Sequence, residues 1–275
     1  MDVLICVACL SAAGPQLAFG DILGSIDPAS RLTLLHVLPR GGDRVTAKRC
    51  LTEAREKLEC GLVEMRIREG DPAREILAEI DEGGHDLVIL RPNEAPGLRR
   101  HFLGSVTTRV VRRAPVSVLV AKQARSRLER ILICSGGGDI GEIVIQAGAR
   151  LAQAVGAQAT LLHVATPVAS MYTGLGEIDE SLSRLLQTDT PIARNLRHGA
   201  EILDQYEVPA ELKLRYGIVA DEIIRESIEG DYDLILMGAK KGLVRFKRLM
   251  LGAMTKEVVA KSERSVLVVR QVLGS

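Results

Sequence analysis

The chain repeats one sequence pattern twice, and this repeat constrains its fold more than any other feature. The stretch VLICVACLSAAG, from Val3, matches ILICSGGGDIGE, from Ile131. In the same order, TLLHVLP matches TLLHVATP, HDLVIL matches YDLILM, and FLGSVTTRVVRRAPVSVLV matches MLGAMTKEVVAKSERSVLVV. The numbering offset between matched residues rises from 128 to 148, so the second copy holds extra residues in its middle. The repeat predicts two domains, 1–124 and 129–275, called repeat 1 and repeat 2, with an insert at about 168–195.

Within each copy, short apolar runs rich in β-branched residues alternate with helical patterns. This alternation is typical of right-handed βαβ units and of a parallel sheet with helices on both faces. The predicted fold class is therefore α/β, with two tandem doubly wound, Rossmann-like parallel-sheet domains related by a pseudo-two-fold axis. The predicted strands are Val3–Val7, Leu32–Val37, Leu62–Arg68, Leu87–Leu90, Val116–Val120, Ile131–Ile133, Thr160–Val164, Ala210–Tyr216, Leu234–Met237 and Val266–Val269. Helical spacing is clearest at Thr46–Cys60, Ala73–Asp81 and Ser105–Arg113.

Composition excludes several classes of function. Lys and Arg total 36 and Asp and Glu total 35, so the net charge of +1 argues against binding by bulk positive charge. Aromatic residues make up 3% and Trp is absent, which leaves few rings for stacking on bases. No apolar run reaches the roughly 18 residues that span a bilayer. We expect neither nucleic acid nor a membrane as partner.

The five cysteines are odd in number and irregular in spacing. This argues against a disulfide framework and favours a reducing, cytoplasmic location. Cys6 and Cys9 form a CxxC within a predicted strand, where they would face opposite sides as small apolar residues. The N-terminal stretch imitates a signal peptide, but Asp2 stands where a positive charge is expected.

In repeat 2 the first strand is followed by a glycine-rich loop. Ser135, Gly136, Gly137 and Gly138 precede a helix, so backbone N–H groups there can turn toward an anion. Ligands of parallel sheets bind at the carboxyl ends of the strands, where this loop lies. The alternative is a plain tight turn, and Asp139 either caps the next helix or acts as a base.

A second candidate loop of repeat 2 follows its fourth strand. Gly238, Lys240 and Gly242 begin a segment with five cations and no acid, up to Arg248. It ends at a helix start, Gly252–Thr255, where a phosphate would meet N–H groups and positive side chains. A solvated basic loop or a protein-contact patch is the alternative.

The matching segment of repeat 1 has lost its glycines. Arg91 and Glu94 stand at the strand end, and Glu94 would repel phosphate. Ser105 either caps the following helix or donates to a phosphate. His36 and His163 occupy matched strand positions between apolar residues, which favours a structural role. No metal-ligand cluster, G-x-S-x-G or Walker A motif is present.

Together these motifs resemble the universal stress protein family in a tandem two-domain form. The shared features are the TLLHV strand, the G-x-P-A-x-x-I segment from Gly70, DLVIL and DLILMG, the LGSVT helix start and the APVSVLV ending. The resemblance implies a fold of the adenine nucleotide alpha-hydrolase type. It also implies pairing of the two copies through their last strands, so that one chain forms a pseudo-dimer.

The family resemblance also implies which residues contact a nucleotide. In repeat 2 they are Ser135, Gly136, Val164, Met237, Gly238, Gly242, Gly252, Ala253, Met254 and Thr255. In the degenerate repeat 1 they are Cys9, Val37, Leu90, Arg91, Gly104, Ser105, Val106 and Thr107. The two glycine-containing loops of repeat 2 add Gly137 and Lys240 to the candidate phosphate contacts.

Both copies depart from the family's G-x2-G-x9-G-[ST] motif. Gly238 to Gly242 is one residue too long, and Ala253 replaces the Ser or Thr. The expected first-strand Asp is Cys9 in repeat 1 and Gly136 in repeat 2. We therefore expect repeat 1 to bind no nucleotide and repeat 2 to be the candidate site.

The leading hypothesis is a stress-associated cytoplasmic protein that binds ATP, AMP or another phosphate ligand in repeat 2, with Mg²⁺ accompanying ATP. The alternative is a regulatory or docking scaffold that binds no nucleotide. A third is a PP-loop-type ATP pyrophosphatase, since Ser135–Asp139 is similar to S-G-G-x-D-[ST], but Ile140 holds the last position. We expect no catalytic residue and at most weak ATP hydrolysis. The insert would be a lid or a surface helix, and two chains could form a homodimer.

Overall fold

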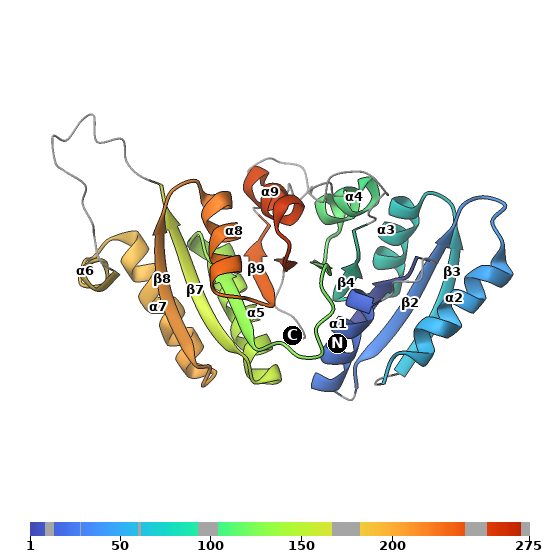
Figure 1. The fold of residues 1–275 in the computed structure, drawn as a ribbon, viewed down its shortest axis with the longest axis horizontal. Coiled ribbons are helices and arrows are strands. Elements are labelled where there is room, and N and C mark those ends of the chain that lie inside the picture. The colour runs from blue at the N-terminus through green and yellow to red at the C-terminus, as the bar shows by residue number, and fades with distance from the viewer. Residues whose placement is uncertain are drawn as a thin grey trace.

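The computed structural model describes residues 1–8, 14–27, 29–59, 62–92, 104–166, 182–239 and 252–270. Strands and helices alternate along both copies (Figure 1). Repeat 1 contains β1 (Asp2–Cys6), α1 (Gly14–Ile26), β2 (Arg31–Leu38), α2 (Arg44–Glu56), β3 (Leu62–Glu69), α3 (Pro72–Gly83), β4 (Leu87–Leu90), α4 (Ser105–Arg113) and β5 (Ser117–Val120). Repeat 2 contains β6 (Arg130–Cys134), α5 (Gly138–Val155), β7 (Gln158–Ala165), α6 (Leu182–Leu186), α7 (Pro191–Gln205), β8 (Ala210–Tyr216), α8 (Val219–Glu229), β9 (Leu234–Gly238), α9 (Ala253–Lys261) and β10 (Ser265–Val269).

All ten strands belong to one sheet, ordered β3-β2-β1-β4-β5-β10-β9-β6-β7-β8. Within each copy neighbouring strands are parallel. The copies join where β5 and β10 pair antiparallel, with Leu119 opposite Leu267. The predicted α/β fold with two tandem parallel-sheet units and the predicted pairing of the last strands are confirmed. Figure 1 shows the two units side by side about this junction.

Helices cover both faces of the sheet because alternate strand residues point to opposite faces. On one face, buried side chains of α1, α2, α5 and α7 pack against the odd-numbered residues Val3 and Ile5 of β1. On the other, α3, α4, α8 and α9 pack against Leu4 of β1 and Leu132 of β6. The inner strands are almost continuously buried, as expected for parallel strands covered on both sides, whereas the edge strands β3 and β8 are partly exposed.

One helix ends earlier than its sequence pattern predicts. The predicted helix Thr46–Cys60 is α2, which begins at Arg44 and stops at Glu56. The N–H of Leu58 bonds to the carbonyl of Arg55, which tightens the last turn. Leu58 then lies in the core with 4% exposure, so the chain leaves the helix there.

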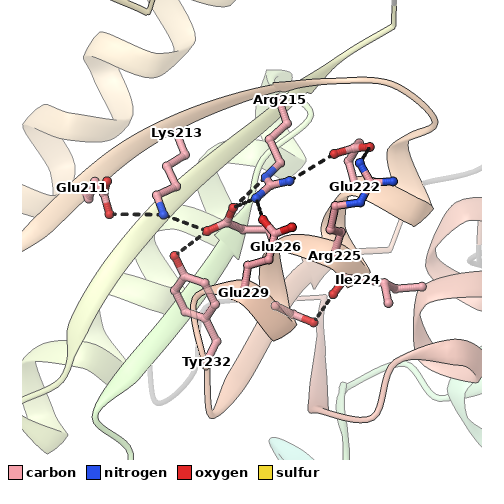
Figure 2. A network of polar contacts seen from close by, with 10 residues as sticks. Glu211, Lys213, Arg215, Glu222, Ile224, Arg225, Glu226, Glu229 and Tyr232 are labelled. Carbon is pink, nitrogen blue, oxygen red and sulfur yellow. Dashed lines mark hydrogen bonds and ion pairs between the residues drawn. The ribbon is translucent and has the colours of Figure 1, made fainter.

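Each copy also holds a buried carboxylate among cations. In repeat 2, Glu226 of α8 pairs with Lys213 (2.9 Å) and Arg215 (2.6 Å) of β8 and accepts from the hydroxyl of Tyr232 (3.0 Å) (Figure 2). In repeat 1, Glu79 of α3 pairs at 2.6 Å with both Arg66 and Arg68 of β3. These pairs attach α3 and α8 to the outermost strands of the sheet.

At the junction, each copy places one positively charged side chain against the last helix of the other copy. Lys122 after β5 donates to the carbonyls of Val259 (2.7 Å) and Ser262 at the C-terminal end of α9. Arg270 after β10 donates to the carbonyl of Val111 (2.5 Å) near the end of α4. A positive group at a helix C-terminus satisfies carbonyls and complements the helix dipole, so each copy provides such a group to the last helix of the other.

One disulfide bond departs from the expectation drawn from cysteine count. Cys50 of α2 is disulfide-bonded, and the second cysteine lies outside the described residues. Cys6 and Cys134 are free, at matched positions at the ends of β1 and β6. No helix in the described ranges is long and apolar enough to cross a membrane.

Candidate functional site

The candidate site of repeat 2 lies at the carboxyl end of its strands, around β6. Strand β6 pairs with β9 on one side and β7 on the other, with Cys134 opposite Met237 and Leu162. The order β8-β7-β6-β9-β10 reverses direction at β6, because the chain first builds outward and then returns to its other side. Ligands of open α/β sheets bind at such a switch point. The described ends of β6, β7 and β9, from which the predicted loops start, therefore lie next to one another there.

The glycine loop after β6 has a backbone that needs glycine. Gly137 and Gly138 have φ of 80° and 69°, the left-handed region that other residues adopt only under strain. The hydroxyl of Ser135 accepts from the N–H of Gly137 (3.2 Å), which folds the loop back on itself. A Cβ added at Gly136 would meet nothing within 4 Å, so that glycine borders open space.

The second wall is the N-terminus of α9. Gly252 is its N-cap residue with φ of −62°, so the helix has no side-chain cap from this position. Among the described residues, a Cβ at Gly252 would come no nearer than 3.9 Å to another atom, so neither the backbone nor this packing requires glycine there. Ala253 and Met254 are exposed beside it. The α9 N-terminus thus lacks a side-chain cap and leaves room beside Gly252 within the described part of the chain.

Three helices that start at these loops share this property. The N-cap residues of α4, α5 and α9 are Gly104, Gly137 and Gly252, and none of these helices has a side-chain cap. By contrast, α2 and α3 are capped by Asp43 and Asp71. Uncapped N–H groups at a helix N-terminus favour an anion. The hypotheses that Ser105 or Asp139 caps its helix are wrong, since both residues lie inside the first turn.

Other predicted contacts have partners within the fold. The hydroxyl of Thr255 is buried and donates to the carbonyl of Gly238 (3.2 Å), which ties α9 to the end of β9. A Cβ at Gly238 would lie 2.3 Å from Cγ2 of Ile140, so this glycine admits α5 against the strand. The positions of Thr255 and Gly238 are thus explained by packing. Val164 and Met237 are the next-to-last residues of β7 and β9.

Part of the candidate site lies outside the described residues. This holds for Lys240 and Gly242 in the basic loop, for Cys9 and Glu94 in repeat 1, and for residues 168–181 of the insert. In repeat 1, the described candidates are Val37 in β2, Leu90 and Arg91 at the end of β4, and Gly104, Ser105, Val106 and Thr107 at the start of α4.

The matched histidines hold the strand ends together. The Nδ1 atom of His36 lies 2.7 Å from the carbonyl oxygen of Val7, and that of His163 lies 3.2 Å from the carbonyl oxygen of Ser135. Because a carbonyl only accepts, each Nδ1 carries the proton. The structural role predicted for both histidines is confirmed, and that of His163 includes holding the glycine loop.

Sequence analysis missed Asn195 at this edge. A Cβ added at Gly137 would lie 2.2 Å from the side-chain nitrogen of Asn195 in α7, so the amide rests against the glycine loop. The insert precedes α7 and hides its correspondence with α2, so no sequence signal pointed to Asn195.

The free cysteine near this edge lacks what a nucleophile requires, and the described residues lack what a metal site requires. Burial raises the pKa of the Cys134 thiol far above its usual range, and the nearby Glu226 charge raises it further, so this thiol is not a nucleophile. Across the described ranges, no three His, Cys, Asp or Glu residues gather in a group that could hold a metal.

A doubly wound parallel sheet with glycine at the helix starts of its switch point places both copies in the class of Rossmann-like α/β domains. The sequence profile of the universal stress protein family matches residues 26–122 and 127–270. The chain belongs to the universal stress protein family, as the motifs predicted.

Individual relatives agree with this assignment. The universal stress protein in the QAH/OAS sulfhydrylase 3' region of Thermus aquaticus is 33% identical over 141 residues, which is 51% of this chain and 97% of that protein. Universal stress protein Slr1230 of Synechocystis is 24% identical over 69% of this chain and 59% of its own length. A functionally unknown protein from Pseudomonas aeruginosa has the same fold, with a TM-score of 0.74, 20% identity and coverage of 98% and 92% of the two chains.

Proposed function

We propose that repeat 2 binds the phosphate groups of an adenine nucleotide at the N-termini of α5 and α9. One observation carries the proposal: within the described residues, Gly136 and Gly252 border open space at the switch point, with no need for glycine in their own packing. The N-cap Gly252 offers no side-chain acceptor to the first turn of α9, and the helix dipole favours an anion there. ATP would bring Mg²⁺ with its phosphates, and the basic residues Lys240 and Lys241 belong to the adjoining loop.

The two domains proposed are 1–124 and 129–275, and only the second is proposed to bind. Repeat 1 keeps the uncapped start of α4 at Gly104, but Arg91, the residue after its fourth strand, stands where Gly238 ends the fourth strand of repeat 2. Glu94 adds a negative charge to the same loop in sequence. Like charges disfavour phosphate at that helix start.

Thermal unfolding of the full chain with ATP, AMP and GTP tests the proposal. A ligand at 100 times its Kd adds about 2.7 kcal/mol to the folded state, which corresponds to a shift of about 5–10 °C. We expect this shift with adenine nucleotides and a smaller one with GTP. No shift with any nucleotide would overturn the proposal.

A matched pair of variants locates the site. Gly252→Asp places a carboxylate at the N-cap of α9, where it caps the helix and repels phosphate, so the shift should disappear while the fold persists. Gly104→Asp makes the same change at α4 and should leave the shift unchanged. Equal loss in both variants would contradict a site confined to repeat 2.

The docking-scaffold alternative predicts a folded chain without any nucleotide shift. A PP-loop pyrophosphatase would need a hydroxyl where Ile140 packs against Gly238, and no such group is present there. Absence of pyrophosphate release from ATP in the presence of the purified chain is the expected result for our proposal.

A further inference from the structure

A groove lies on the outermost strand of repeat 1, away from the nucleotide site at β6. It has a volume of about 550 Å³ and runs between one side of α2 and β3. Figure 1 shows α2 and β3 at the outer end of the molecule, opposite the end that holds α6 and α7. Its lining consists of Arg44, Val45, Lys48, Arg49, Thr52 and Ile67.

The lining is cationic and apolar. The three cations lie at helical spacing on one side of α2, and Val45 between them is 78% exposed. Arg49 pairs with Glu53 at 3.8 Å, with both side chains more than 60% exposed, so this pair contributes little. The carboxylate of Asp43 is occupied by the N–H groups of Val45 and Thr46. The residues that line the groove include no acid.

The strand beside the groove is an edge of the sheet. Among the described strands, β3 pairs with β2 alone, so the N–H and C=O groups of its outer side have no strand partner. Leu62 and Met65 on this strand are 65% and 47% exposed. A long edge strand with exposed apolar residues is a template for another extended segment.

We propose that β3 and the groove under α2 bind an extended acidic segment of a partner protein by strand addition. The backbone of the segment would pair with the free edge of β3. Every second side chain would point to the α2 side, where carboxylates meet Arg44, Lys48 and Arg49 and apolar groups meet Val45 and Ile67. Charge complementarity of this kind sets both the partner and its register.

Charge favours an acidic partner over a second copy of this chain. Pairing of two β3 edges about a two-fold axis would bring both sets of α2 cations together, and like charges at an interface are unfavourable. In repeat 2 the chain covers its own outer helix, because α6 packs on α7. Among the described residues of repeat 1, no helix packs on α2 in the way that α6 packs on α7.

The test uses the full chain and a fluorescent eight-residue peptide that alternates threonine and glutamate, followed by anisotropy. We expect binding, and about tenfold weaker binding to Lys48→Glu/Arg49→Glu, because opposite charge in the groove becomes like charge. The control Lys57→Glu/Arg127→Glu makes the same change in net charge outside the groove and should alter the Kd less than about threefold. A peptide with lysine for glutamate should not bind.

Strand addition is tested separately with N-methylated peptides. Alternate N–H groups of a strand point to opposite edges, so only one alternating set can bond to β3. Methylation of the set that faces β3 should abolish binding, and methylation of the other set should leave the Kd unchanged. Three results would overturn the proposal. They are equal binding of both methylated isomers, no binding of the peptide at millimolar concentration, and binding of an oligonucleotide that the groove variant no longer binds. None of these results depends on whether repeat 2 binds nucleotide.

Discussion

Replacement of the buried carboxylate of Glu226 by an amide tests how strongly the network in Figure 2 holds the outer edge of repeat 2. The side chain of Glu226 is 2% exposed, and it neutralises Lys213 and Arg215, which are 30% and 21% exposed. Glu226→Gln keeps the shape and removes the charge. Removing one partner of a buried pair costs about 3–5 kcal/mol, and water can reach these cations in part, so we expect about 3 kcal/mol.

Urea and thermal unfolding measure this loss. For a chain of this size each kcal/mol corresponds to about 2–4 °C, so the midpoint should fall by about 6–12 °C. The matched control is Glu229→Gln, the same chemical change at a 54% exposed carboxylate that also pairs with Arg215. An exposed pair contributes about 1 kcal/mol or less, so the control should change little. Equal effects of the two substitutions would refute the argument from burial.

The pH dependence gives the same network a second signature. Burial raises the pKa of Glu226, but hydrogen bonds from Lys213, Arg215 and Tyr232 outweigh it, and the net pKa is lowered. A carboxyl with a lowered pKa binds fewer protons in the folded state, so its contribution is present above about pH 4.3 and is lost as the pH falls further. The stability gap between the natural chain and Glu226→Gln should therefore be full at pH 7 and shrink below pH 4. A gap that grows in acid would contradict this reasoning.

Three further predictions concern the junction and the glycine loop. Burial lowers the pKa of Lys122 to about 8, whereas a lysine in the unfolded chain has a pKa of about 10.4, so between these pH values the unfolded chain binds more protons. The free energy of unfolding, measured with urea, should therefore rise with pH across that range. The Lys122→Met variant should lack this rise. Gly156→Ala, at φ 68° with no described atom near its Cβ, should lower the free energy of unfolding by about 1–2 kcal/mol. Gly137→Ala should lower it by more, because its Cβ would also lie 2.2 Å from Asn195. The difference between the urea midpoints of the two variants measures this steric clash. Arg270→Met should leave the thermal midpoint unchanged or raise it, since two buried nitrogens of this guanidinium have no partner within the described structure.

The fold could be predicted because the repeat and the βαβ alternation are sequence-local signals. The strand assignments agree with the structure, and the 3-2-1-4-5 order of each copy follows the rule that the chain returns to the other side of its first strand. The end of α2 could not be predicted, because helical spacing continues past Glu56 to Leu58, and tertiary burial of Leu58 ends the helix first.

The position of the candidate site stays a prediction, and the sequence could not give the role of each glycine in it. Glycines that follow a strand in sequence can serve a ligand, a turn or a close packing, and only space distinguishes them. Gly252 faces open space, Gly137 needs its φ of 80°, and Gly238 admits Ile140. The repeat gave one sequence signal for the carboxylate network, because Arg68 and Arg215 stand at matched positions. The acids of the network lie on helices and contact these cations only in the folded protein.

The junction between the two copies lets repeat 1 support the fold of repeat 2. Strands β5 and β10 are buried along their whole length because each covers the edge of the other. Lys122 from repeat 1 also satisfies the C-terminal carbonyls of α9, whose N-terminus forms the candidate phosphate site. Without repeat 1, Val266 and Val268 would lie on an open edge and α9 would lose this cation. The last strand of repeat 1 and Lys122 therefore support the copy that is proposed to bind.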